Sequence, residues 1–156
     1  MNKGASIVEV LVALVVLAVT ASAVFPVMWW LINKAGGLKY EAEASVVLQE
    51  GMEASYNVMV SDWEAMQTGL TYSPRVVVGG GTQRWGMVEG EEEVAARFTR
   101  GVAVTAVCRA SDTGELVDCG EGGAVDANSK LLTATISWQE KDEDKSISAT
   151  LLVVNI

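Results

Sequence analysis

The longest apolar segment of the chain lies near its N-terminus. Residues 10–32 read VLVALVVLAVTASAVFPVMWWLI, which is 23 residues without a charge. As a helix this segment would be about 34 Å long, enough to cross a hydrocarbon core of about 30 Å. Trp29 and Trp30 stand at its far end, where aromatic side chains favour the headgroup region. The pattern therefore predicts a membrane-spanning helix.

A cleaved secretory signal peptide fits this segment poorly. The apolar region of a signal peptide runs for about 7–15 residues and ends at a cleavage site of the small-x-small type. Here the run is longer, and apolar sequence continues after the small residues Ala21-Ser22-Ala23. We expect the segment to stay attached to the rest of the chain.

Residues 34–67 show the three- and four-residue spacing of an amphipathic helix. The predicted core-facing stripe consists of Leu38, Ala42, Ser45, Leu48, Met52, Tyr56, Met59, Trp63 and Met66. The acidic residues lie mostly off this stripe and should face water: Glu41, Glu43, Glu50, Glu53, Asp62 and Glu64. Gly36-Gly37 is a weak point, because each glycine costs a helix about 1 kcal/mol relative to alanine. It predicts a hinge or a place where the helix melts, and Thr68-Gly69 is the predicted helix end.

The last third of the chain alternates between apolar and polar residues as β-strands do. Strands are predicted over residues 98–109, 130–140 and 146–156, with the polar segment 141–145 as a hairpin turn. The expected inward faces are Phe98, Val102, Val104 and Ala106 in the first strand and Leu132, Ala134, Ile136 and Trp138 in the second. Three antiparallel strands against an amphipathic helix give an α+β fold.

Residues 69–97 are expected to be mostly loop, with short strands at 75–78 and 83–88. Gly79-Gly80-Gly81 lacks the lysine and the spacing of a phosphate-binding loop and is interpreted as a flexible turn. The acidic run 89–93 is interpreted as a solvated loop. A divalent cation is an alternative occupant of that run, although the spacing of an EF-hand is absent from the sequence.

Composition narrows the function classes. The 156 residues suit one domain, and the sequence contains no histidine, which excludes histidine-based catalysis and histidine metal sites. A net charge of −9 argues against nucleic-acid binding. Asp112, Glu115 and Asp118 are the nearest approach to a catalytic cluster, but a solvated loop is the simpler interpretation. We expect no enzyme activity, no metal site and no cofactor.

The two cysteines, Cys108 and Cys119, flank a polar loop between the first two predicted strands. Outside the cytoplasm they would be oxidised, and closing this ring contributes about 3 kcal/mol in the chain-entropy model. The alternative is two free thiols. A head placed across the membrane favours the disulfide.

One charge interrupts the apolar N-terminal pattern. Glu9 stands between Ile7-Val8 and Val10-Leu11, and a carboxylate near hydrocarbon costs a few kcal/mol. Either Glu9 lies at the interface and points to water, or it has a cationic partner within the membrane.

Residues 1–14, MNKGASIVEVLVAL, resemble the type III signal of type IV pilins and pseudopilins. The shared features are a basic residue, a glycine, a small residue, a glutamate five positions after the glycine, and an unbroken apolar helix. The resemblance implies that a prepilin peptidase cleaves between Gly4 and Ala5 and methylates the new amine of Ala5. It implies that Glu9 pairs with the N-terminal amine of a neighbouring subunit. Pro26 stands where many family members carry a helix-kinking proline.

The sequence departs from the family pattern in two places. The leader has only four residues, and Ala5 replaces the phenylalanine or methionine that is common after the glycine. The strong resemblance covers residues 1 to about 32.

Resemblance and pattern together predict four segments. These are a leader (1–4), a transmembrane or filament-core helix (5–33), an amphipathic helix (34–67) and an extracytoplasmic β-sheet head (68–156). The expected function is that of a structural subunit, preferably a minor pilin or pseudopilin, of a type IV pilus or type II secretion-like filament.

The partners that this function implies are the prepilin peptidase, other pilin or pseudopilin subunits and an inner-membrane assembly platform. Before assembly the protein would be a single-pass inner-membrane protein with its head outside the cytoplasm, and afterwards part of a filament at the cell surface or in the periplasm. The alternative is a single-span, membrane-tethered extracytoplasmic binding domain, which needs neither cleavage at Gly4 nor Glu9.

Overall fold

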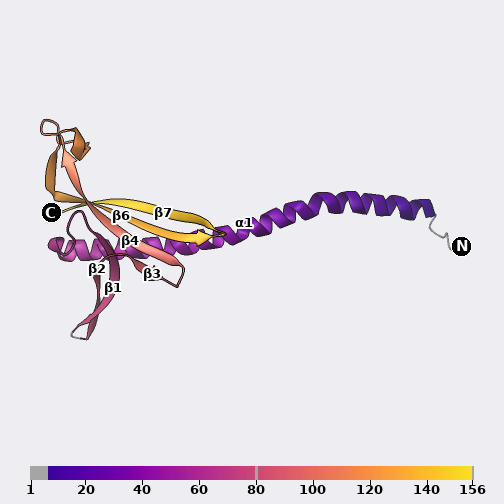
Figure 1. The fold of residues 1–156 in the computed structure, drawn as a ribbon, viewed down its shortest axis with the longest axis horizontal. Helices are drawn as coiled ribbons and strands as arrows, with labels where there is room; N and C mark the ends of the chain where they lie inside the picture. Colours follow the sequence, from indigo (N-terminus) through magenta and orange to yellow (C-terminus); the bar gives the residue numbers. More distant parts are fainter. Residues whose placement is uncertain (1–6, 80, 156) are drawn as a thin grey trace. The chain divides into compact units, whose positions relative to one another are not determined.

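A computed structural model describes residues 7–79 and 81–155, which form one long helix and an antiparallel β-sheet (Figure 1). The fold is therefore α+β. In chain order the elements are α1 (Ile7–Ser61), the 3-10 turn η1 (Trp63–Ala65), β1 (Thr71–Gly79), β2 (Thr82–Glu89), β3 (Glu92–Val94), β4 (Phe98–Arg109), β5 (Leu116–Val117), the 3-10 turn η2 (Cys119–Glu121), β6 (Ala124–Glu140) and β7 (Glu143–Val154).

The chain divides into two compact units, Met1–Tyr40 and Glu41–Ile156, and α1 contributes to both. The helix is continuous through Gly36 and Gly37, so the glycine pair does not interrupt it. It ends at Ser61, six residues before the end that the sequence predicted. The reason is Asp62, whose side chain accepts a hydrogen bond from the backbone N–H of Glu64 and so caps a separate turn, η1.

The sheet has the strand order β2-β1-β4-β6-β7, and both β3 and β5 pair with β4. The three predicted strands correspond to β4, β6 and β7. β4 has the predicted bounds, whereas β6 begins six residues early and β7 three residues early. The β6–β7 turn is consequently shorter than predicted. Its two residues, Lys141 and Asp142, both have positive φ angles, which is the backbone of a tight two-residue hairpin turn.

The segment 69–97, expected to be mostly loop, is mainly strand. β1 and β2 pair from Tyr72↔Glu89 to Gly79↔Thr82, which confirms and lengthens the two predicted short strands. The Thr82 hydroxyl donates to the Gly79 carbonyl across the turn, and Gly80 lies outside the described residues. The acidic run is not a loop throughout, because β3 begins at Glu92. Pairing with neighbouring strands, which the local composition does not reveal, converts this segment into sheet.

The part of α1 that belongs to the second unit packs on the sheet through small residues. Its buried positions are Ala44, Gly51, Ala54, Ser55, Val58 and Met59. Of the predicted stripe, Met59 and Met66 are buried, Leu48, Met52 and Trp63 are partly buried, and Leu38, Ala42, Ser45 and Tyr56 are exposed. The true face is rotated from the predicted one because small side chains let the helix backbone approach the strands closely.

The sheet supplies most of the bulk of the core. Val102, Val104, Leu132, Ala134, Ile136 and Val153 are buried on it. Phe98 and Trp138 meet edge to face with ring centroids 6.0 Å apart. Ala106, predicted to face inward, is exposed, because the β4–β6 register shifts between Ala106 and Cys108 and turns Val107 and Cys108 inward.

Candidate functional site

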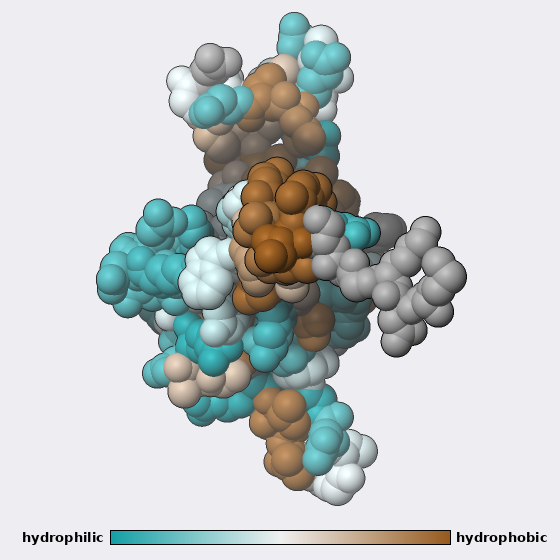
Figure 2. Space-filling view, turned by 90° about the vertical axis from the view of Figure 1, so that its right-hand side faces the viewer, coloured by the Kyte–Doolittle hydropathy of each residue, from teal (hydrophilic) through white to brown (hydrophobic). Residues whose placement is uncertain are grey.

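The N-terminal part of α1 presents an uncovered apolar surface. Every large apolar side chain between Ile7 and Ile32 is exposed, from 51% at Val10 to 80% at Ile7. In Figure 2 this part of the helix points at the viewer and is mostly brown. An 18-residue window in it has a mean hydropathy of 2.7 and no buried share, so the helix is long and apolar enough to cross a membrane. A surface of this extent needs lipid or protein to cover it.

The few polar groups of this segment are satisfied within the helix. The Thr20 hydroxyl lies 3.0 Å from the Val16 carbonyl and 2.9 Å from the Leu17 carbonyl, and the Ser22 hydroxyl donates to the Val19 carbonyl at 2.8 Å. Such back-bonding is what a hydrocarbon environment demands of a hydroxyl group. Pro26 lies inside α1. Because proline has no N–H to donate to the preceding turn, a kink at this position stays our prediction.

Glu9 is the only charged residue between Ile7 and Ile32, and it lies in the first turn of the described helix with its side chain exposed. The negative carboxylate is favourably placed there, because the N-terminal end of a helix carries partial positive charge. Gly4 and Ala5, the two residues of the expected processing site, lie outside the described residues.

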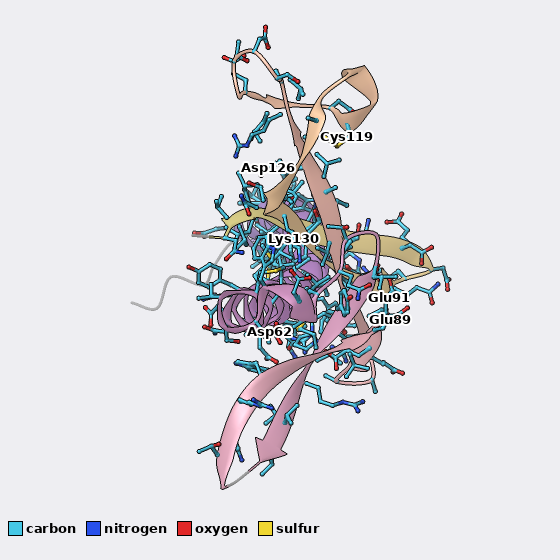
Figure 3. The ribbon with its side chains drawn as sticks, turned by 90° about the vertical axis from the view of Figure 1, so that its left-hand side faces the viewer. Asp62, Glu89, Glu91, Cys119, Asp126 and Lys130 are labelled. Carbon is cyan, nitrogen blue, oxygen red and sulfur yellow. A yellow bond between two sulfur atoms is a disulfide. The ribbon has the colours of Figure 1, made fainter. Side chains whose placement is uncertain are left out.

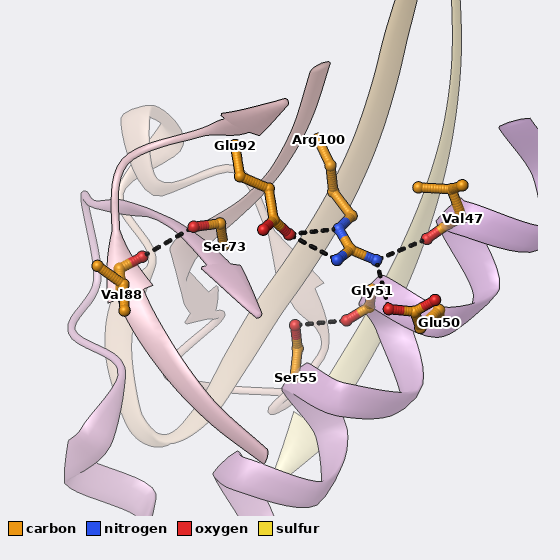
Figure 4. A network of polar contacts seen from close by, with 8 residues as sticks. All are labelled: Val47, Glu50, Gly51, Ser55, Ser73, Val88, Glu92 and Arg100. Carbon is orange, nitrogen blue, oxygen red and sulfur yellow. Dashed lines mark hydrogen bonds and ion pairs between the residues drawn. The ribbon is translucent and has the colours of Figure 1, made fainter. Parts of the chain in front are cut away.

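In the second unit a buried arginine connects the helix to the sheet (Figure 4). Arg100 of β4 has a side chain that is only 4% exposed. Its Nε lies 2.8 Å from Oε1 of Glu92 in β3, and its Nη1 lies 3.2 Å from Oε1 of Glu50 and 3.3 Å from the Val47 carbonyl of α1. Three elements are thus held by one guanidinium group, whose fork of donors suits several acceptors.

A buried lysine fixes the chain where α1 ends. Lys130 of β6 is 8% exposed, and its Nζ donates to the carbonyls of Trp63 at 2.7 Å and Met66 at 2.9 Å. The same ammonium group lies 4.5 Å from the centroid of the Trp63 ring. Figure 3 labels Lys130 and Asp62, which come from the sheet and from the end of the helix.

Sequence patterning missed both of these residues as inward-facing groups, yet the signal was present. Arg100 stands between Phe98 and Val102, and Lys130 stands two residues before Leu132, so each shares the parity of buried apolar neighbours. A basic residue at an inward position of a strand needs an acceptor, because an unpaired buried charge is costly.

Cys108 and Cys119 form a disulfide with an S–S distance of 2.13 Å, which confirms the expected bridge. Beside it, Arg109 Nε lies 2.7 Å from Oδ2 of Asp126. The hydrogen bond from Arg109, followed by those from the Ser129 hydroxyl and the Asn128 N–H, lowers the pKa of the Asp126 carboxyl. Cys119 and Asp126 are labelled in Figure 3.

Asp112, Glu115 and Asp118, the three acidic residues considered above as a candidate catalytic cluster, make local contacts. Asp112 accepts from the N–H of Thr113, Asp118 accepts from the N–H of Gly120 at the start of η2, and the Glu115 carbonyl accepts from the N–H of Ala110. Within residues 7–79 and 81–155, no group of three or more acidic or cysteine side chains is placed to hold a metal ion. In the acidic run, Glu92 is engaged by Arg100.

Comparisons with models of known protein families, with curated proteins and with solved structures found no match to this chain. The function is therefore inferred from the residues and contacts described above.

Proposed function

We propose that this protein is a structural subunit of a pilin-like filament, as a minor pilin or pseudopilin, anchored and assembled through the N-terminal part of α1. The observation that carries the proposal is an exposed apolar helix surface, Ile7–Ile32, whose only charge is Glu9 near its start. The resemblance of residues 1–14 to a prepilin signal supplies a reason for that charge.

Two successive environments can cover the apolar surface of the N-terminal part of α1. Before assembly, lipid would cover it, with Trp29 and Trp30 at one interface. In a filament, the same surface of neighbouring helices would cover it, and side chains exposed on all sides of the helix suit a bundle in which each helix has several neighbours. Thr20 and Ser22 cost little in either environment, because their hydroxyls are bonded within the helix.

Glu9 gives the proposed assembly its register. Cleavage after Gly4 would create an ammonium group at Ala5, one helical turn before Glu9. In a helix bundle, an unpaired ammonium group and an unpaired carboxylate are each unfavourable, whereas pairing between adjacent subunits satisfies both. A single polar pair in an apolar interface favours one relative position of the helices over others.

The proposal is tested on the full chain, expressed with a prepilin peptidase and the filament machinery of its host. Mass spectrometry of the mature protein should find N-methylated Ala5 as the first residue. Gly4→Ala should block the cleavage. Glu9→Ala should be cleaved normally and should be lost from sheared filaments, whereas the control Glu93→Ala, which removes an exposed acid from the second unit, should be incorporated.

Recovery of the wild-type chain with Met1 to Gly4 still attached, and absent from filaments, would refute the proposal. That result would favour the membrane-tethered binding domain, which shares the anchor but needs no processing. Normal incorporation of Glu9→Ala would leave the filament role standing and refute the pairing mechanism.

A further inference from the structure

The β1–β2 hairpin extends beyond the rest of the sheet as a two-stranded ribbon. β1 pairs with β4 only at Thr71 and Tyr72, whereas its pairing with β2 continues to Gly79↔Thr82. Figure 1 shows the hairpin reaching away from β4, β6 and β7. A free two-stranded ribbon is marginally stable in water, and this ribbon exposes Val76 at 50%, Val77 at 38% and Val78 at 70%.

The hairpin also carries the two arginines of the second unit whose side chains have no bonding partner in the described residues. Residues 41–156 contain 19 acidic and 8 basic residues. Five of the basic side chains bond to oxygen atoms in the described structure, namely Arg97, Arg100, Arg109, Lys130 and Lys145. Lys141 contributes to lowering the pKa of Glu143.

The two remaining basic residues, Arg75 and Arg84, have no ion pair or hydrogen bond of their guanidinium groups in the part of the chain that the structure describes. Both lie on one face of the hairpin. Arg84 is directly opposite Val77, and Arg75 is two residues before Val77 on the same strand, so they share a face with it. Gly86, opposite Arg75, leaves room for the Val77 side chain, since a Cβ there would lie 2.7 Å from Val77 Cγ2. Val76 and Val78 alternate with Val77 along β1 and therefore face the other side of the ribbon. The face that carries Arg75, Val77 and Arg84 is thus cationic, with one exposed valine beside its two arginines.

A matching surface exists on the same chain. The side of α1 that faces away from the sheet exposes Val46 at 67%, Tyr56 at 47% and Val60 at 64%, with the exposed Glu53 between them. These positions recur at helical spacing along one outward face. The chain has no lysine or arginine from residue 40 to residue 74, so this part of α1 contributes no cation of its own to the face.

We propose that the β1–β2 hairpin of one subunit docks on the outward α1 face (Val46, Glu53, Tyr56 and Val60) of a second copy of this chain. Arg75 and Arg84 would meet Glu53, and Val77, on the same face of the hairpin, would contact the apolar residues around it. Two arginines are too few to hold a polyanion, which binds through many phosphate contacts. The second unit itself is strongly acidic, so a second copy provides the opposite charge.

The proposed contact joins two different surfaces and therefore has a direction. This inference rests on the proposed function, which it extends by naming a contact between subunit heads. A hairpin on one copy and a helix face on the next are different surfaces, so the interface is heterologous and can repeat from copy to copy. Subunit heads that share a large negative charge repel one another, and a cationic hairpin placed on each acidic neighbour offsets that repulsion.

The test uses the full chain in neutral detergent micelles. Gly79 lies on the same face as Arg75 and Val77, and a side chain there has open space. Gly79→Cys on one tagged copy and Val60→Cys on another are treated with a short bismaleimide, which leaves the native Cys108–Cys119 disulfide unreacted. The expected product is a dimer that joins the two tags. Val154→Cys, which is also exposed, replaces Gly79→Cys in the control and should give only background cross-linking.

Charge reversal supplies the second arm. Arg75→Glu with Arg84→Glu should reduce the dimer to the background level, and adding Glu53→Arg to the Arg84→Glu single variant should restore part of it. Lys141→Glu is the matched control and should leave the dimer unchanged.

The proposal is overturned if the cross-linked product between positions 79 and 60 does not exceed the control or survives the double reversal. Retention on heparin that the double reversal abolishes, without a cross-linked dimer, would reassign the hairpin to a polyanion. Because this assay needs neither processing nor filaments, its failure leaves the processing and Glu9 results of the proposed function untouched.

Discussion

Arg100 extends across Gly51, so that a Cβ built on the glycine would lie 3.1 Å from Cδ of the arginine. The glycine thus opens the space through which an arginine from β4 reaches Glu50 and the Val47 carbonyl on α1. The glycine weakens the helix by about 1 kcal/mol relative to alanine, and it stands at the point where helix and sheet are joined.

Replacing Arg100 by methionine should destabilise the second unit by about 2 kcal/mol, because the contacts to Glu92 and α1 are lost together. The loss stays below that of a fully buried pair, since Glu50 and Glu92 are partly exposed and can be hydrated. Denaturant unfolding of the full chain in detergent, followed by tryptophan fluorescence, measures the change. Lys145→Ala, which breaks the exposed pair with Glu143, should leave the free energy of unfolding nearly unchanged, because solvent screens this pair. Equal effects of the two variants would contradict the assignment.

Lys130→Met should release the segment that follows α1. The substitution keeps the apolar stem but leaves the Trp63 and Met66 carbonyls without their donor, at a cost of about 2 kcal/mol. Hydrogen exchange should become faster for the amides of residues 62–70 and stay unchanged in β7. If Lys141→Met, at an exposed turn, produced the same change, the effect would not come from these two carbonyls.

Reduction of Cys108–Cys119 should destabilise the second unit by about 3 kcal/mol on the chain-entropy account. Local protection should fall first between residues 110 and 123, because this loop is otherwise attached by the two residues of β5 and by a few turn hydrogen bonds. Denaturant curves with and without a phosphine reductant measure the difference. Identical curves would show that the bridge does not contribute to stability.

The Asp126 carboxyl should titrate below its ordinary value of 3.8, since Arg109, Ser129 and the Asn128 N–H all stabilise the charged form. A pKa that is lower in the folded state adds stability above the unfolded-state value, and this stability is lost as the pH falls through the folded value. Carboxyl chemical shifts in an NMR titration would locate the midpoint. Stability should therefore fall less steeply with acid in Asp126→Asn than in wild type, with Asp142→Asn as the control. A wild-type midpoint at or above 3.8 would contradict the prediction.

Sequence periodicity predicted the strands that have regular two-residue alternation. β4 was predicted to the residue, and Leu132, Ala134, Ile136 and Trp138 of β6 are buried as expected. Alternation survives in these strands because one face packs on α1 while the other meets solvent. It failed at Ala106, where a register shift reverses the faces. In β1 it predicted only residues 75–78 of the strand Thr71–Gly79, because three consecutive valines contain no alternation that would mark the ends of the strand.

The sequence by itself determined the character of the N-terminal segment. An uncharged run of 23 residues with one acid before it demands a helix and an apolar covering, since backbone groups in hydrocarbon must bond within their own segment. The tertiary structure alone decided which face of α1 meets the sheet and which basic residues are buried there. Those outcomes depend on how closely two elements approach, and Gly51, Ala54 and Ser55 allow an approach that the larger residues of the predicted stripe would prevent. Close packing between segments distant in the chain leaves no pattern in the sequence, whereas burial in a membrane requires a continuous apolar run that the sequence shows directly.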